Sequence, residues 1–158
     1  MNSVYIETTI PSYLVGRRNK QASVAADQDA TREWWDKQRR YFRAYTSVFT
    51  RDEAGRGDPK LSAERLELLA GIPTLDIPAE FSALENDLIN LFQLPEKATT
   101  DASHLGLAIF HKMDYLLTWN CTHLANAILQ KELIDYCGYY NLHLPVICTP
   151  ENLIRLQQ

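Results

Sequence analysis

The sequence predicts an α/β fold in which helices cover both faces of a mostly parallel central sheet, giving three layers. Short apolar segments at residues 4–6, 46–49, 115–117 and 146–148 alternate with stretches long enough for helices. Each segment is almost continuously apolar, as expected for strands that helices cover on both faces. The chain has 158 residues, of which 46% are hydrophobic and 23% charged, so we expect one domain over residues 1–158.

Capping signals predict where two of the helices begin and where one ends. Asp58 precedes Pro59, which places a capping side chain before a proline at the first helical position. Gly71 follows the apolar face of this helix and marks its end. Thr149 and Pro150 repeat the start signal near the C-terminus.

Residues 22–45 are predicted to form one long helix that carries large aromatic side chains beside arginines. This combination suits base stacking and phosphate contact. The alternative is a helix that packs its aromatics on the sheet or on a dimer partner and leaves its arginines in solvent. Because the aromatics are numerous for a single sheet face, we expect some of them to form a homodimer interface. The aromatics are Trp34, Trp35, Tyr41 and Phe42, and the arginines are Arg39, Arg40 and Arg43.

The composition of the chain limits the cellular compartments and the binding partners that we expect for the protein. No apolar run reaches the roughly 18 residues of a membrane span, and the first residues lack the basic start of a secretion signal. Cys121, Cys137 and Cys148 fit neither a disulfide framework nor a zinc site. We therefore expect a cytoplasmic protein with no membrane partner. The net charge of −4 excludes a pervasively basic surface, so any nucleic acid would be bound locally.

Polar side chains follow three of the predicted strands. Glu7 comes directly after the first strand, Glu53 follows the second, and Asn120 follows the third. The carboxyl ends of parallel strands meet at one edge of a sheet, where the functional crevice of such folds lies. We therefore expect these three side chains to converge there.

Asp101 is a fourth candidate for the same edge. It lies in the first turn of a helix that is apolar nearly all round, which predicts a buried helix whose N-terminus faces the site. An acid in this position is also an ordinary partner of the helix dipole. His104 lies three residues later on the same helical face and is able to hold the Asp101 carboxylate, although a buried structural histidine is the favoured interpretation.

These motifs resemble those of the PIN domain family, and particularly of its VapC-type toxin endoribonucleases. In that family an acid and a threonine end the first strand, a glutamate follows the second, and a third acid opens an alanine-rich helix. The next strand ends in a Thr-x-Asp signature. The residues that match, in the family's order and spacing, are Glu7 and Thr8, then Glu53, then Asp101, then Thr118, Trp119 and Asn120.

The resemblance covers essentially the whole chain and implies a PIN-like fold and an endoribonuclease that hydrolyses RNA phosphodiester bonds. It also implies a cognate antitoxin and a homodimer. Independently of the resemblance, oxygen ligands in an acidic pocket suit Mg²⁺ or Mn²⁺. The expected catalytic residues and metal ligands are Glu7, Glu53, Asp101 and Asn120, supported by Thr8, Thr118 and His104. The candidates for contact with RNA are Arg39, Arg40, Arg43 and Trp119.

Two residues depart from the family's pattern, in which the first and fourth acids are aspartates. Glu7 and Asn120 occupy these positions. An amide oxygen can bind a hard cation, but it leaves the pocket with one negative charge fewer. The alternative function is therefore a catalytically weak or inactive domain that binds RNA or an antitoxin. The sequence lacks the motifs of other common enzyme classes, and it lacks the strand-terminal lysine expected of a receiver-like phosphoacceptor domain.

Overall fold

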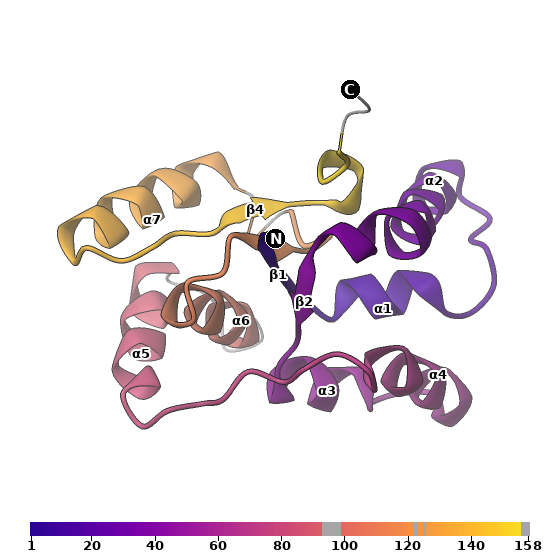
Figure 1. Cartoon of the computed structure of the whole chain (residues 1–158), viewed down its shortest axis with the longest axis horizontal. Coiled ribbons are helices and arrows are strands. Elements are labelled where there is room, and N and C mark those ends of the chain that lie inside the picture. The colour runs from indigo at the N-terminus through magenta and orange to yellow at the C-terminus, as the bar shows by residue number, and fades with distance from the viewer. Residues whose placement is uncertain (93–98, 122, 125, 156–158) are drawn as a thin grey trace.

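The computed structural model describes residues 1–92, 99–121, 123–124 and 126–155. Its sheet has four strands, all parallel, in the order β2-β1-β3-β4 (Figure 1). The strands are β1 (Ser3–Ile6), β2 (Arg43–Tyr45), β3 (Tyr115–Leu117) and β4 (Val146–Cys148). Within the described residues, no helix is both long and apolar enough to span a membrane.

Helices connect the strands and complete the three-layer α/β/α fold, which confirms the predicted fold class (Figure 1). The α-helices are α1 (Thr9–Leu14), α2 (Ala22–Glu33), α3 (Val48–Ala54), α4 (Pro59–Leu69), α5 (Phe81–Phe92), α6 (Thr99–Phe110) and α7 (Ala127–Tyr139). Shorter turns are the π-helical η1 (Trp34–Gln38) and the 3-10 helices η2 (Arg39–Tyr41) and η4 (Pro150–Asn152).

Side chains alternate between the two faces of the sheet. Tyr5 and Leu116 pack against a layer made of α5, α6 and α7. Val4, Ile6 and Leu117 point to the other face, where they pack with residues of α1, α4 and η1. All five side chains are fully buried. Because both faces are covered, β1 and β3 read as continuous apolar runs in the sequence.

The second strand lies earlier than the sequence predicted. The segment 46–49 is not a strand, because Ser47 caps α3 and its hydroxyl accepts a hydrogen bond from the backbone N–H of Thr50. The predicted helix over residues 22–45 is also wrong at its C-terminal end. The observed helical segment continues from α2 through η1 and η2 and ends at Tyr41, because Phe42 is extended and leads directly into β2.

The aromatics of this region are largely part of the chain's own core. Trp34 is 0% and Trp35 is 9% exposed, and Phe42 packs against the same cluster. The expectation that one sheet face cannot bury them is therefore wrong for both tryptophans, while Tyr41 is partly exposed. The homodimer stays a prediction.

The predicted helix caps agree with the structure at α4. The carboxylate of Asp58 accepts a hydrogen bond from the backbone N–H of Leu61 at 2.9 Å, and Pro59 is the first helical residue. The start signal at Thr149 and Pro150 marks the start of only the short 3-10 helix η4.

Candidate metal centre

The candidate site lies at the carboxyl ends of β1 and β3. β1 pairs with β2 on one side and with β3 on the other, so the chain connections diverge at this point of the sheet. Open parallel sheets bind their ligands at such switch points, where the loops on either side leave a crevice. Glu7 follows β1, Thr118 follows β3, and Glu53 comes from α3, which follows β2.

Glu7 is buried, and its carboxylate is held through a single oxygen. Oε2 accepts hydrogen bonds from the hydroxyl of Thr118 at 2.7 Å and from the hydroxyl and backbone N–H of Thr9 at 2.5 and 3.1 Å. Within the described residues, Oε1 of Glu7 receives no hydrogen bond. The carboxylate is thus fixed in orientation and keeps one oxygen for a ligand.

Glu53 is held in the same way. Its Oε1 accepts from the hydroxyl of Thr8 at 2.9 Å and lies 2.5 Å from Nε2 of His104. No donor among the residues that the structure describes reaches its Oε2. Burial raises the pKa of Glu53, but the hydrogen bond and charge of His104, helped by Thr8, outweigh burial and hold the pKa below its usual value. Glu53 is therefore a carboxylate at neutral pH.

His104 is 1% exposed and lies between Glu53 and Tyr5. Its Nδ1 is 2.6 Å from the Tyr5 hydroxyl, which in turn lies 2.6 Å from the hydroxyl of Ser47. Burial lowers the pKa of an imidazole, but here Tyr5, the hydrogen bond to Glu53 and nearby carboxylate charges outweigh burial and raise the pKa of His104 to about 10. His104 is therefore an imidazolium that donates through Nε2 to Glu53.

The predicted contact between His104 and Asp101 is wrong. The two residues share one end of α6, but the imidazole reaches across to α3, which packs against α6, and meets Glu53 there. Asp101 instead turns toward the residues that follow β3. The predicted burial of His104 is confirmed.

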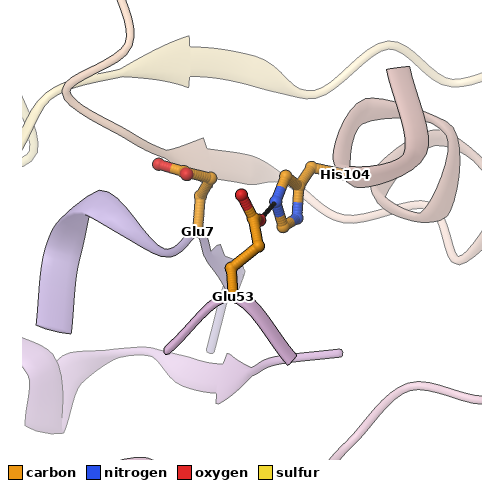
Figure 2. A group of neighbouring side chains, drawn as sticks. All are labelled: Glu7, Glu53 and His104. Carbon is orange, nitrogen blue, oxygen red and sulfur yellow. Dashed lines mark hydrogen bonds and ion pairs between the residues drawn. The ribbon is translucent and has the colours of Figure 1, made fainter. Parts of the chain in front are cut away.

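Glu7, Glu53 and His104 together form a group that could hold a metal ion. One ligand atom from each lies within 4.8 Å of the other two. Figure 2 shows the Glu53 carboxylate turned toward the imidazole of His104, with Glu7 beside them; the three residues come from separate segments of the chain. We call these residues the Glu7–Glu53–His104 group.

Asp101 and Asn120 form a second cluster beside this group. Oδ1 of Asp101 accepts from the side-chain amide of Asn120 at 2.9 Å, and Oδ2 lies 2.8 Å from Nδ1 of His123. The backbone N–H of Asn120 donates to the hydroxyl of Thr118, the same hydroxyl that donates to Glu7. The two clusters are thus joined through Thr118 on one edge of the sheet.

Several residues of this network escaped the sequence analysis. His123, Thr9 and Tyr5 lie in it, and only the position of Thr9 beside Glu7 gave a usable signal. His123 lies three residues after Asn120 in a polar loop, and no spacing rule connects it with Asp101, which is 22 positions away.

The structure separates Trp119 from the arginines that were predicted to contact RNA. The backbone N–H of Trp119 donates to the hydroxyl of Thr9 at 2.8 Å, so this residue borders the site. The arginines lie elsewhere. Arg43 begins β2 and pairs in register with Ser3, at the opposite end of the strands from the carboxylates. Arg39 and Arg40 precede it and lie over the rings of Trp35 and Tyr41.

No protein-family model matches the chain, and no curated protein matches it either. Oε1 of Glu7 and Oε2 of Glu53 are the oxygens without donors among the described residues, and carboxylate oxygens are the ligands that Mg²⁺ and Mn²⁺ prefer. The donor set fits such a cation. Nε2 of His104 could join it only by giving up its contact with Glu53.

Proposed function

We propose that the protein is a metal-dependent endoribonuclease that acts at the Glu7–Glu53–His104 group and the adjoining Asp101. The observation that supports this most is the orientation of the two glutamates. Each is fixed through one oxygen by threonine or histidine donors, and no donor from the described part of the chain reaches its second oxygen. Ligand positions that are set in advance in this way suit a divalent cation.

The residues divide into ligands and residues that position them. Glu7, Glu53 and Asp101 would hold Mg²⁺ or Mn²⁺, with Asn120 as a ligand or as the donor that orients Asp101. The bound cation would neutralise a phosphodiester and lower the pKa of a water molecule for in-line attack. Thr118 and Thr8 hold the two glutamates, and His104 holds Glu53.

The choice of RNA as substrate rests on the resemblance to VapC-type PIN domains. In support, Glu7 and Thr118 follow adjacent parallel strands and are hydrogen-bonded to each other, and Asn120 next to Thr118 donates to Asp101. The proposal extends to what the resemblance implies, a cognate antitoxin and a homodimer. It also includes a cytoplasmic location, which suits the free thiols of Cys121, Cys137 and Cys148.

A second function is favoured by one specific observation. Both oxygens of Asp101 are already engaged, by Asn120 and His123, so a cation at Asp101 must share these oxygens with two existing contacts. If Asp101 keeps these contacts and binds no cation, the protein would bind RNA or an antitoxin without cleaving RNA.

The decisive experiment compares RNA cleavage by three proteins with millimolar Mn²⁺ and with EDTA. We expect the wild type to cleave single-stranded RNA only with metal. Glu7→Gln, which removes a ligand charge at nearly constant volume, should be inactive. The matched control is Glu132→Gln, at an exposed position of α7, and it should cleave like the wild type. RNA binding without cleavage in all three would favour the second function.

A further inference from the structure

We propose that Tyr13 and Trp119 form a stacking subsite for one base of single-stranded RNA, beside the Glu7–Glu53–His104 group. The inference rests on the proposed ribonuclease function and narrows its substrate to single strands. We call these two residues the stacking pair. Tyr5 also contacts the Glu7–Glu53–His104 group but is fully buried, whereas Tyr13 and Trp119 are only partly buried.

The stacking pair is connected to Glu7 through hydrogen bonds of Trp119. The two ring centroids lie 5.7 Å apart and the ring planes differ by 13°. The indole N–H of Trp119 donates to the hydroxyl of Thr31, and its backbone N–H donates to the hydroxyl of Thr9, both at 2.8 Å. The Thr9 hydroxyl in turn donates to Glu7. A single threonine therefore connects the stacking pair with a proposed ligand.

Tyr13 also lines a pocket. It lies one helical turn after Thr9 in α1, so the two side chains share a face of the helix. On the side of the α1–α2 connection, Tyr13 borders a pocket of about 240 Å³ whose lining includes Arg18 and Arg32. Arg32 donates through Nη2 to the backbone carbonyl of Leu14. Its other guanidinium nitrogens make no hydrogen bond to the described residues, although the charge of Asp29 lies nearby, so they can donate to a phosphate.

The connection after α1 adds more positive charge. Gly16 has a φ of +80°, a conformation that glycine adopts without strain, and the chain turns there into an exposed basic segment. Arg17 and Lys20 in this segment are exposed, and Arg18 pairs with Asp29. Arg18 and Arg32 thus share a pocket with Tyr13, next to an exposed basic segment, although the charge of Asp27 also lies near Tyr13. Proteins that bind single strands combine these features, because the rings stack on bases of any type and the cations contact the backbone.

The test uses the full chain in EDTA, so that the RNA stays intact, and measures binding of a labelled single-stranded oligoribonucleotide by fluorescence anisotropy. We expect Tyr13→Ala to weaken binding about tenfold, in the range measured for loss of one stacked base. Tyr13→Phe keeps the ring and should bind like the wild type. The matched control is Tyr139→Ala, at a tyrosine of α7 that is 83% exposed, and it should also bind like the wild type. Thermal melts of each variant establish that it is folded.

Two further binding measurements test the preference for single-stranded RNA and the role of the basic residues. The same oligonucleotide annealed to its complement should bind more weakly, because its bases are already stacked on one another. The double variant Arg17→Gln with Lys20→Gln should reduce the slope of log Kd against log salt by about 1.4, roughly 0.7 for each phosphate contact with a single strand. Wild-type affinity in a folded Tyr13→Ala, equal affinity for duplex, or an unchanged salt slope would each overturn the inference.

The failure of this inference and the failure of the proposed function give different results. If Tyr13→Ala weakens binding but no metal supports cleavage, the subsite stands and the ribonuclease proposal falls. If metal-dependent cleavage is present and Tyr13→Ala leaves its KM unchanged, the ribonuclease proposal stands and the subsite falls.

Discussion

Nε2 of His104 lies 2.5 Å from Oε1 of Glu53, and this contact ties α6 to α3 across the candidate metal centre. The imidazole is in turn held by Tyr5, a residue of β1, so strand and helices jointly fix one carboxylate. The orientation of Glu53 therefore depends on the buried core as much as on its own helix.

Removing this imidazole should destabilise the fold. His104→Ala leaves a cavity and leaves Tyr5 without a partner on that side, so we expect the free energy of unfolding to fall by about 2–4 kcal/mol. His143→Ala, at an exposed histidine, should change it by less than about 0.5 kcal/mol. Urea unfolding of both variants measures the difference. Equal midpoints would contradict a structural role for His104.

A second prediction concerns pH. Oδ2 of Asp114 accepts hydrogen bonds from the backbone N–H and the hydroxyl of Ser3, at 2.8 and 3.1 Å. The backbone bond is the largest influence and, with the hydroxyl, outweighs burial, so the pKa of Asp114 lies below its usual value of 3.8. Because the folded pKa is lower than the unfolded one, the stabilisation is present above about pH 4 and is lost as the pH falls through the folded pKa.

Asp114→Asn should therefore be less stable than the wild type at pH 7, by about 1 kcal/mol for the loss of charge-assisted hydrogen bonds. The difference should shrink when both proteins are unfolded with urea near pH 3. Asp135→Asn, which removes an exposed ion pair with Lys131, serves as the control and should show little effect at pH 7. A difference that is the same at both pH values would show that the carboxylate charge is not involved.

The strands show what the sequence could and could not predict. β1 and β3 lie inside the sheet with both faces covered, so their apolar runs were sufficient to predict them as strands. β2 is an edge strand that contains Arg43 and is only partly buried, and the more apolar run after it belongs to the start of α3. Apolar content alone cannot distinguish an edge strand from the helix that follows it.

The candidate site shows the same limit. The strand-end rule predicted where Glu7 and Asn120 lie, because it follows from the direction of parallel strands. It could not predict that His104 meets Glu53 rather than Asp101, since that depends on how α6 packs against α3. Side-chain partners between separate elements depend on packing angles that residue spacing does not contain.

A third prediction compares two helical glycines. A Cβ built on Gly106 in α6 would lie 2.8 Å from Cε2 of Phe81 in α5, so Gly106→Ala forces the buried Phe81 ring to shift and should cost about 1–3 kcal/mol. A Cβ on Gly138 in α7 meets nothing within 4 Å, and Gly138→Ala should stabilise the protein by up to about 1 kcal/mol. Thermal unfolding should therefore shift in opposite directions. A shift of the same sign in both variants would contradict close packing at Gly106.

The fourth prediction separates catalysis from binding. Asp101→Asn keeps the size of the side chain and removes the charge, so we expect cleavage to fall by at least about 100-fold while RNA affinity and melting temperature stay close to wild type. Asp76→Asn, at an exposed aspartate, should remain active. Cleavage assays in Mn²⁺ and binding assays in EDTA measure both properties. Residual wild-type cleavage in Asp101→Asn would remove this residue from the proposed ligands.

The last prediction concerns Asn120, whose amide donates to Asp101 at 2.9 Å. Asn120→Asp replaces that donor by a second carboxylate, and two like charges about 4 Å apart repel by roughly 1–4 kcal/mol for effective dielectric constants of 80 to 20. Without metal, the variant should therefore melt at a lower temperature than the wild type. A bound cation relieves the repulsion, so the variant should gain more stability from Mn²⁺ than the wild type does.

The same argument predicts the metal dependence of cleavage. The variant should reach its half-maximal rate at a lower Mn²⁺ concentration, because the added charge strengthens cation binding, whereas the wild type should require millimolar metal. Asn90→Asp, at an exposed position of α5, adds the same charge elsewhere and should leave the midpoint unchanged. Melting curves and cleavage rates over one Mn²⁺ series measure both effects. If Asn120→Asp and the wild type share one midpoint in both measurements, Asn120 lies outside the metal's ligands, and its contact with Asp101 only supports the fold.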